Sequence, residues 1–244
     1  MKAMVLAAGL GTRLRPLTDN CPKALVTLNG RTLLEICLER LRGFGVTEAI
    51  VNTHHFAGMV AAYLAEKHNF GMHIEISREE VLLDTGGGLK QAAWFFLQDA
   101  GRGEAPDEPF LVHNVDVVST IDLAAMLAQH RQRGALATLA VQNRLSSRSL
   151  LFDEHGILCG RRAGPDAAPE IVRAVENPQA LAFCGIHVLS PSLLTRLDEE
   201  GAFPIVPAYL RLAQGGAKIQ AYHADACRWR DLGRPQSLAA AAQE

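Results

Sequence analysis

The sequence lacks three features that would assign it to a membrane, to the disulfide-rich secreted proteins or to nucleic acid. No apolar run approaches the roughly 18 residues of a transmembrane helix. The five cysteines are scattered without a C-x-x-C pair, which is typical of reduced thiols in the cytoplasm. The net charge of −2 arises from interspersed charges of both signs and provides no basic surface for nucleic acid. We therefore expect neither a membrane nor a nucleic-acid partner.

The start of the chain also lacks the pattern of a secretion signal. Met1 and Lys2 lead directly into an apolar segment that is too short for the apolar core of such a signal. Together with the scattered cysteines, this start predicts a cytoplasmic protein.

The chain instead contains an alternation of strand-like and helix-like segments. Apolar runs predict strands at 4–8, 48–53, 73–77, 110–114 and 135–141. Helical periodicity predicts helices at 31–41, 57–67, 88–97 and 123–131. This alternation predicts an α/β fold in three layers, a mostly parallel (mixed) sheet covered by helices on both faces. With no internal repeat or linker, residues 1–244 are expected to form a single domain, and the Gly- and Pro-rich stretch 101–108 a surface loop.

The strongest functional signal lies in the first 26 residues. The first strand breaks at Gly9-Leu10-Gly11, and Thr12, Arg13, Arg15 and Lys23 follow within a short distance. Glycines after a strand let backbone N–H groups approach phosphate oxygens closely. Arginine and lysine supply the positive charge that a polyphosphate requires. The segment therefore predicts the triphosphate site of an enzyme that uses a nucleotide.

Two familiar phosphate-binding motifs do not fit this segment. Leu14 stands where the third glycine of G-x-G-x-x-G would be, and no G-x-x-x-x-G-K-[ST] is present. As a whole, the string L-A-A-G-L-G-T-R-L-R-P-L-T-D-N-C-P-K-A-L-V over residues 6–26 resembles the opening of the sugar-phosphate nucleotidyltransferases. This resemblance implies their Rossmann-like fold, with a nucleoside triphosphate and a sugar-1-phosphate as substrates.

Two aspartates are candidates for binding a divalent cation. Asp116 follows the strand at 110–114, and Asp231 lies in the turn Trp229-Arg230-Asp231-Leu232-Gly233-Arg234-Pro235. Ligands of open α/β sheets bind at the carboxyl ends of the strands, and carboxylate oxygens suit a hard cation beside a triphosphate. The resemblance implies that Asp116 and Asp231 bind the metal, expected to be Mg²⁺, although Val115 replaces the glycine usual before the first aspartate.

The resemblance also implies the roles of the remaining site residues. Arg13, Lys23 and Asp116 would be catalytic, with Arg13 at the departing pyrophosphate and Lys23 at the α-phosphate. The nucleotide would contact Leu6, Ala7, Ala8, Gly9, Gly11, Thr12, Arg13, Lys23, Thr85, Gly86, Gly87 and Asn114. The sugar would contact Gly87, Asn114, Glu176 and Gly185.

Two segments bear on the sugar phosphate. Asp84-Thr85-Gly86-Gly87-Gly88 predicts a loop in close backbone contact before a helix, and its spelling is similar to that of N-acetylmuramate-1-phosphate uridylyltransferases. Glu176-Asn177-Pro178 stands where many family members have Glu-Lys-Pro, so the usual lysine is absent. Arg144, Arg148 and Arg173 are candidates to replace it, and the sequence does not rank them.

These patterns predict an enzyme that joins a nucleoside triphosphate to a sugar-1-phosphate and releases pyrophosphate. UTP with N-acetylmuramate-1-phosphate, in cell-wall sugar metabolism, is the favoured pair. The alternatives are GTP with mannose-1-phosphate or a heptose-1-phosphate, CTP with phosphocholine, and a non-catalytic nucleotide-binding regulatory subunit. The sequence leaves open whether the chain forms a homo-oligomer.

Overall fold

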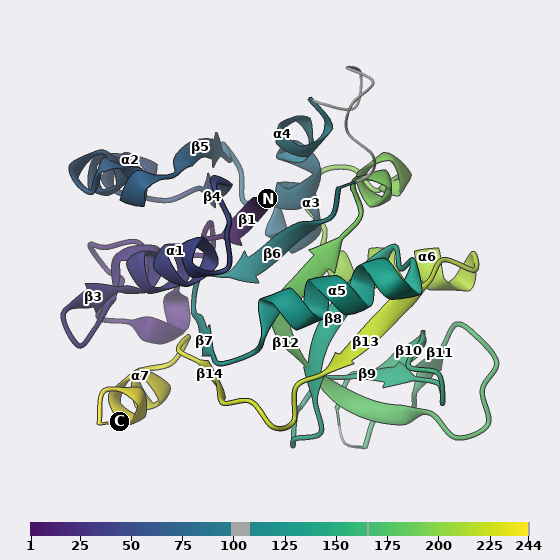
Figure 1. The fold of residues 1–244 in the computed structure, drawn as a ribbon. Coiled ribbons are helices and arrows are strands. Elements are labelled where there is room, and N and C mark those ends of the chain that lie inside the picture. Colours follow the sequence, from purple (N-terminus) through teal and green to yellow (C-terminus); the bar gives the residue numbers. More distant parts are fainter. Residues whose placement is uncertain (99–107, 165, 244) are drawn as a thin grey trace.

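A mixed sheet of ten strands forms the centre of the protein in the computed structural model, which describes residues 1–98, 108–164 and 166–243 (Figure 1). The strands of this sheet are β1 (Lys2–Leu6), β4 (Glu48–Thr53), β5 (His73–Arg78), β6 (Phe110–Asn114), β8 (Ala137–Gln142), β9 (Ser149–Phe152), β10 (Leu158–Arg162), β11 (Glu170–Ile171), β12 (Gln179–Leu189) and β13 (Ile219–His223). Two small ladders accompany it, β2 (Thr27–Leu28) with β3 (Arg31–Thr32), and β7 (Val117–Ser119) with β14 (Trp229–Asp231).

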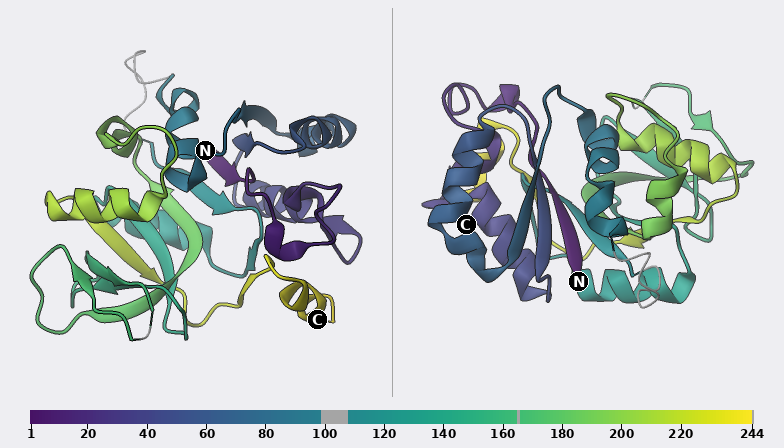
Figure 2. Two further views of the ribbon diagram at one scale, coloured as in Figure 1. Left: turned by 180° about the vertical axis from the view of Figure 1, so that it is seen from behind. Right: turned by 90° about the horizontal axis from the view of Figure 1, so that it is seen from above.

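Helices cover both faces of the sheet (Figure 2). The α-helices are α1 (Leu33–Gly43), α2 (Ala57–Glu66), α3 (Asp84–Gln91), α4 (Ala93–Leu97), α5 (Leu123–Arg133), α6 (Ile205–Gln214) and α7 (Pro235–Ala241), and the 3-10 helices are η1 (Thr12–Leu14), η2 (Lys23–Leu25), η3 (His68–Gly71) and η4 (Pro191–Arg196). Buried side chains of α1, α2, α5 and α7 contribute to one hydrophobic cluster, and those of α4, η4 and α6 to the other. The expected layered α/β architecture is thereby confirmed.

The sheet has a parallel part and an antiparallel part. Strand β1 lies between β4 and β6 and pairs with both in parallel, and β5 continues this part beyond β4. Strand β12 joins the other side of β6 in the antiparallel sense and also pairs with β8 and β9. The carboxyl ends of β1, β4 and β6 therefore meet at one edge of the sheet, where ligands of open α/β sheets bind.

Two predicted elements at the start of the chain have other bounds in the structure: the strand expected at 4–8 is Lys2–Leu6, and the helix expected at 31–41 is Leu33–Gly43. The first strand ends at Leu6 rather than Ala8, because the Ala7 N–H donates to the side-chain Oδ1 of Asn52 (2.7 Å) instead of continuing the ladder. The first helix begins at Leu33 rather than Arg31. Thr32 is its N-cap, and the hydroxyl of Thr32 accepts a hydrogen bond from the Glu35 N–H (3.0 Å).

The glycine-rich segment at 84–88 forms the first part of α3 rather than a loop before a helix. The helix expected at 88–97 is instead divided at Ala92 into α3 and α4. Of the loop expected at 101–108, residues 101–107 lie outside the described residues. No helix in the described ranges is long and apolar enough to cross a membrane.

Two histidines are buried on the neighbouring strands β6 and β12 of the sheet. His113 of β6 is fully buried, with its Nδ1 2.8 Å from the Asn114 carbonyl oxygen. His187 of β12 is 2% exposed, and its Nδ1 lies 2.7 Å from the Tyr209 hydroxyl. Burial lowers the pKa of His113 from 6.5 to about 4 and the pKa of His187 to about 3. Both side chains are therefore neutral in the native protein at neutral pH.

This burial predicts a loss of stability in acid. Below pH 6.5 the unfolded chain binds protons that the native histidines do not, so the free energy of unfolding falls as the pH falls toward 4. Between pH 7 and pH 5 the protonation of His113 and of His187 in the unfolded chain should each contribute a loss of about 2 kcal/mol. The test is urea unfolding of the wild type and of His187→Gln at pH 7 and at pH 5. The fall in the free energy of unfolding between the two pH values should be about 2 kcal/mol smaller in His187→Gln. His73→Gln, at an exposed position, is the control, and equal pH dependence in His187→Gln and the wild type would contradict the assignment.

Candidate functional site

A cavity of about 450 Å³ opens at the carboxyl ends of β1 and β6. It is lined by Leu6, Ala8, Gly9, Lys23, Asn52, Leu82, Asp84, Thr85, Asn114, Val115, Asp116 and Ala202. Seven of these were predicted as site residues from the sequence: Leu6, Ala8, Gly9, Lys23, Thr85, Asn114 and Asp116. The structure therefore brings together residues from the N-terminal string, the glycine segment and the end of β6.

The loop after β1 folds tightly around Gly11. The Gly11 carbonyl accepts hydrogen bonds from the Leu14 N–H and the Thr18 hydroxyl, each at 2.8 Å. Gly11 has φ +65°, and a Cβ there would lie 2.9 Å from Thr18 Cγ2, so a larger residue would be strained and crowded. Gly11 and Thr12 thus shape the loop outside the cavity lining, and the turn leads into η1, which carries Arg13.

Two acidic and two basic side chains meet at one side of the cavity. Lys23 forms an ion pair with Asp116, and both side chains are largely buried. Arg13 Nη2 lies 4.0 Å from Asp231 Oδ2 at the more exposed end of the cluster. Each carboxylate therefore has a cation beside it, and the cluster combines opposite charges within a small volume.

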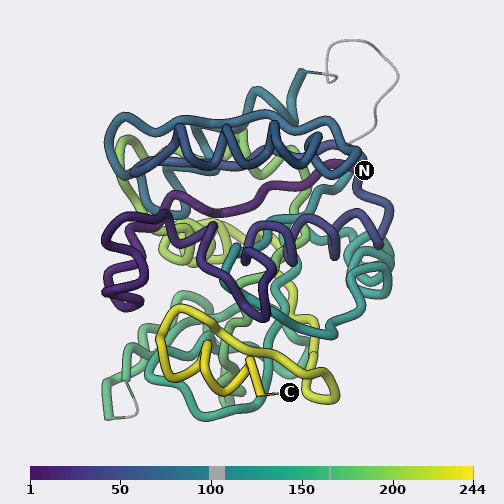
Figure 3. Tube along the Cα trace, turned by 90° about the vertical axis from the view of Figure 1, so that its left-hand side faces the viewer, coloured from purple at the N-terminus to yellow at the C-terminus, as the bar shows by residue number. Residues whose placement is uncertain are grey.

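The C-terminal segment brings Asp231 to this cluster. β14 pairs with β7, which sets Asp231 opposite Val117, and the Leu232 N–H donates to the Asp116 carbonyl (2.8 Å). Figure 3 shows this segment, in yellow, returning beside the purple N-terminal loops. The two aspartates, far apart in sequence, are thus neighbours because of one short antiparallel ladder.

Gly233 leaves open the space that the two carboxylates share. A Cβ on Gly233 would lie 2.8 Å from Asp231 Oδ1, 3.0 Å from Asp116 Oδ2 and 2.8 Å from Arg13 Nη2. No group of three or more acidic, histidine or cysteine ligands occurs among the described residues. Two carboxylates with room between them fit a hard divalent cation of the Mg²⁺ type, which takes its other ligands from water and substrate phosphates.

A second polar pair, Asn52 and Glu79, supports the opposite wall of the cavity and was not predicted. Both residues are 2% exposed, and Asn52 Nδ2 donates to Glu79 Oε1 at 2.7 Å. Glu79 Oε2 in turn accepts from the Leu83 N–H at 2.9 Å. Asn52 Oδ1 also accepts a hydrogen bond from the Ala7 N–H, so the pair links the end of β1, β4 and the start of α3. An asparagine after the apolar run Ala49–Val51 was the available signal in the sequence.

Gly86 and Gly87 face the segment 201–203 rather than the cavity. Their N–H groups donate to the Phe203 carbonyl at 2.9 and 3.2 Å. A Cβ on Gly86 would overlap the Phe203 ring, and a Cβ on Gly87 would overlap the Gly201 carbonyl oxygen. The close backbone approach expected of these glycines is therefore an approach to another part of the chain, and Asp84 and Thr85 are the members of the segment that line the cavity.

The two remaining residues predicted for the sugar lie in different surroundings. Gly185, with φ +72°, sits at an irregularity of β12, where a Cβ would lie 2.6 Å from the Asn114 amide nitrogen. Glu176 is exposed in the connection between β11 and β12 and is outside the cavity lining. Gly185 is thus next to the cavity, whereas its lining does not support the role predicted for Glu176.

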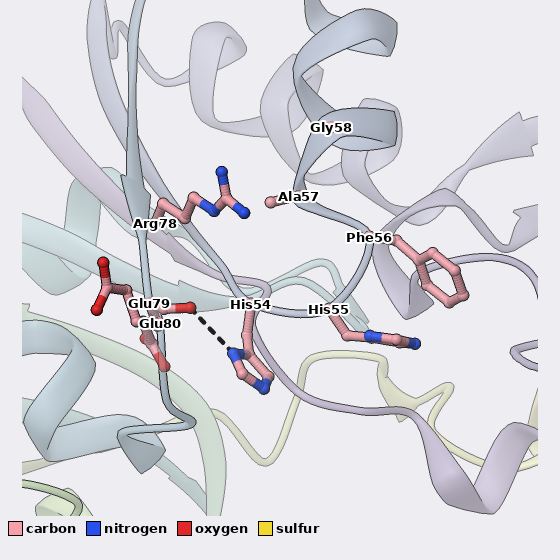
Figure 4. A pocket seen from close by; sticks show the side chains of 8 residues that line it. All are labelled: His54, His55, Phe56, Ala57, Gly58, Arg78, Glu79 and Glu80. Atoms are coloured by element: carbon pink, nitrogen blue, oxygen red, sulfur yellow. Dashed lines mark hydrogen bonds between the residues drawn. The ribbon is translucent and has the colours of Figure 1, made fainter.

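A second cavity of about 660 Å³ lies at the carboxyl ends of β4 and β5 (Figure 4). Its lining comprises His54, His55, Phe56, Ala57, Gly58, Arg78, Glu79 and Glu80. His54 Nδ1 is 3.0 Å from the Glu79 carbonyl oxygen. Glu79 therefore lines the second cavity and is joined to the first by its hydrogen bond with Asn52, which lines that cavity.

Comparison with known proteins adds an independent finding. The family model described as Nucleotidyl transferase matches residues 2–244. The N-acetylmuramate alpha-1-phosphate uridylyltransferase of Caulobacter vibrioides is 34% identical over 250 residues, which cover 98% of this chain and 94% of that protein. The mannose-1-phosphate guanylyltransferase of Mycobacterium tuberculosis is 30% identical over 97% of this chain, which spans 62% of that relative's length. The UDP-glucose pyrophosphorylase from Acinetobacter baumanii has a similar fold, with a TM-score of 0.78 and 20% identity over 99% of this chain and 91% of that one.

The packing of α3 predicts the effect of a single methyl group. Gly86→Ala should lower the free energy of unfolding by about 2 kcal/mol, because the added Cβ overlaps the Phe203 ring. Gly43→Ala is the matched control, since a Cβ there meets nothing within 4 Å and alanine favours the helix. Urea unfolding should separate the two variants. Equal stability of both would show that the α3 glycines are not required for packing.

Proposed function

The chain belongs to the nucleotidyl transferase family, and we propose that it transfers a uridylyl group from UTP to N-acetylmuramate-1-phosphate. Its relatives include uridylyltransferases and guanylyltransferases of sugar-1-phosphates, so the chain is a nucleotidyltransferase of that class. The choice of substrates rests on the resemblance to the Caulobacter uridylyltransferase and on the spelling Asp84-Thr85-Gly86-Gly87-Gly88. We further propose that residues 1–244 act as one cytoplasmic domain.

One observation carries the proposal, the convergence of Lys23, Asp116, Arg13 and Asp231 beside a cavity at the end of β1. A reaction between two phosphate-bearing substrates brings negative charges together, so it needs fixed positive charge and a bridging cation. A protein that only binds a nucleotide has no need of two carboxylates around the space beside Gly233. The cluster therefore favours catalysis over a regulatory role.

The chemistry assigned to these side chains is positioning and charge stabilisation. An oxygen of the acceptor phosphate attacks the α-phosphorus of the nucleoside triphosphate, the bond to the bridging oxygen breaks, and pyrophosphate leaves. Lys23 is placed to stabilise charge that develops at the α-phosphate, and Arg13 to neutralise the departing pyrophosphate. Asp116 and Asp231 would hold Mg²⁺, which when bound offsets the repulsion between the two phosphate groups. No covalent intermediate on the protein is required.

A second substrate pair, GTP with mannose-1-phosphate, is supported by the 30% identity to the Mycobacterium guanylyltransferase.

The substrate pairs are distinguished by measuring pyrophosphate release in the presence of Mg²⁺. The donors tested are UTP, GTP, CTP and dTTP. The acceptors are N-acetylmuramate-1-phosphate, mannose-1-phosphate, glucose-1-phosphate, a heptose-1-phosphate and phosphocholine. The proposal expects UTP with N-acetylmuramate-1-phosphate to give the highest kcat/KM. A higher value for another pair would replace the substrates, and no turnover with any pair would contradict the catalytic function.

The charge cluster predicts the effect of removing either partner of its buried ion pair. Lys23→Ala and Asp116→Ala should each lower kcat about a hundredfold or more, as expected for the loss of one charge-stabilising group. Steady-state kinetics on the best substrate pair measures this, with melting temperatures to confirm folding. Lys67→Ala, which removes an exposed lysine beside Glu66, is the control and should leave kcat unchanged. Near-normal turnover in either cluster variant would refute the role assigned to that residue.

A further inference from the structure

The proposed function leaves one charge unassigned, the cation that binds the phosphate of the acceptor, and the following inference rests on that function. The lysine that would be expected to bind this phosphate is replaced by Asn177 in Glu176-Asn177-Pro178. Arg144, Arg148 and Arg173 remain as candidates, and the structure separates them by what each one contacts.

Arg144 follows β8 and is fixed by two contacts. Its guanidinium carbon lies 3.8 Å from the centre of the Trp229 ring, and its Nη2 donates to the Phe183 carbonyl at 3.1 Å. Trp229 is held in turn, because its indole N–H donates to the Cys184 carbonyl at 2.8 Å. The arginine is thus oriented by Phe183 of β12 and by Trp229 of β14, and Trp229 is itself held by β12.

These contacts place Arg144 beside β14, the strand that carries Asp231, although Arg144 is outside the lining of the cavity. Trp229 and Asp231 are two residues apart on β14, so their side chains point to the same face of that strand. Phe183 and Cys184 directly precede Gly185, which lies against the Asn114 amide at the cavity. Arg144 therefore lies between β12, next to the Gly185 irregularity, and the strand that carries Asp231.

The charge of Arg144 is not neutralised by a carboxylate. No ion pair of Arg144 occurs within the described ranges, and its Nε is buried without a hydrogen-bond partner there. The carboxylate of Asp225 is engaged elsewhere, with the Asn143 N–H at 2.6 Å and His223 Nδ1 at 3.6 Å. A partly buried arginine with no carboxylate partner and a fixed orientation has the properties of an anion ligand.

The other two candidates lack this placement. Arg148 is exposed, in a short turn where Ser146 bonds to its backbone N–H and carbonyl. Arg173 follows β11, and its N–H donates to the Cys159 carbonyl of β10 at 3.2 Å. Neither stands beside β14 through a contact comparable to that of Arg144 with Trp229.

We propose that Arg144 binds the phosphate group of the sugar-1-phosphate, taking the place of the lysine that this chain lacks. Because Nη2 already donates to the Phe183 carbonyl and Nε is buried, the donors left for a phosphate are those of Nη1 and the second N–H of Nη2. Stacking on Trp229 limits the movement of the guanidinium. The residue selects for a phosphate monoester at the acceptor position, and its contribution is to acceptor binding rather than to nucleotide binding.

The first test reads the neighbouring tryptophan and needs no turnover. The chain has two tryptophans, and Trp94→Phe removes the half-exposed one, leaving Trp229 as the reporter. Titration of this variant with methyl phosphate and with N-acetylmuramate-1-phosphate should change its emission in a saturable way. Adding Arg144→Ala should weaken the apparent affinity at least tenfold, whereas Arg148→Ala should leave it within twofold. Equal affinity in the Arg144→Ala protein, or no response of the parent, would overturn the proposal.

The second test separates acceptor binding from nucleotide binding in the active enzyme. Arg144→Ala should raise KM for the sugar-1-phosphate at least tenfold and leave KM for the nucleoside triphosphate within twofold, with partial rescue in Arg144→Lys. Equal rises in both KM values, or an unchanged acceptor KM, would contradict the assignment. If the wild type shows no turnover with any pair, the proposed function fails, and the fluorescence titration still decides the role of Arg144.

Discussion

The site depends on the short ladder between β7 and β14, which holds two carboxylates side by side. Asp116 and Asp231 would repel one another in isolation, and the protein offsets this with Lys23 at one carboxylate and Arg13 near the other. Gly233 keeps the space between them free. The arrangement places negative charge where a divalent cation can bind and positive charge where phosphates can bind. The catalytic roles proposed for Lys23, Arg13, Asp116 and Asp231 follow from this juxtaposition.

The parallel and antiparallel halves of the sheet contribute different residues to the site. The parallel half, with β1 and β4, provides the glycine loop and the Asn52–Glu79 pair, and it forms the side assigned to the nucleotide. The antiparallel half, centred on β12, provides Gly185 and the backbone carbonyls that orient Arg144 and Trp229. The boundary between the halves is β6, whose end carries Asn114 and leads to Asp116. Donor and acceptor phosphates are therefore expected to meet at the end of β6.

Much of this could be predicted from the sequence, because local patterns determine local structure. The strands 48–53 and 110–114 agree with the structure residue for residue, and the N-terminal string predicted Lys23 at the cavity. Contacts between residues far apart in the sequence could not be predicted, because local patterns contain no information about them. Asn52 and Glu79 become a pair only when β4 and β5 align, and the glycines of α3 are explained only by Phe203. The same limit prevented the sequence from ranking the three arginines, and the single-domain expectation stays a prediction.

The most direct test of the account is the Mg²⁺ dependence of pyrophosphate release in the wild type and in Asp231→Asn. Replacing one carboxylate by an amide keeps the size of the side chain and removes the charge that the cation needs. The account predicts no release in excess chelator for the wild type, and at least a tenfold higher Mg²⁺ concentration for half-maximal rate in Asp231→Asn. Release that persists in chelator, or identical Mg²⁺ dependence in the two proteins, would contradict it.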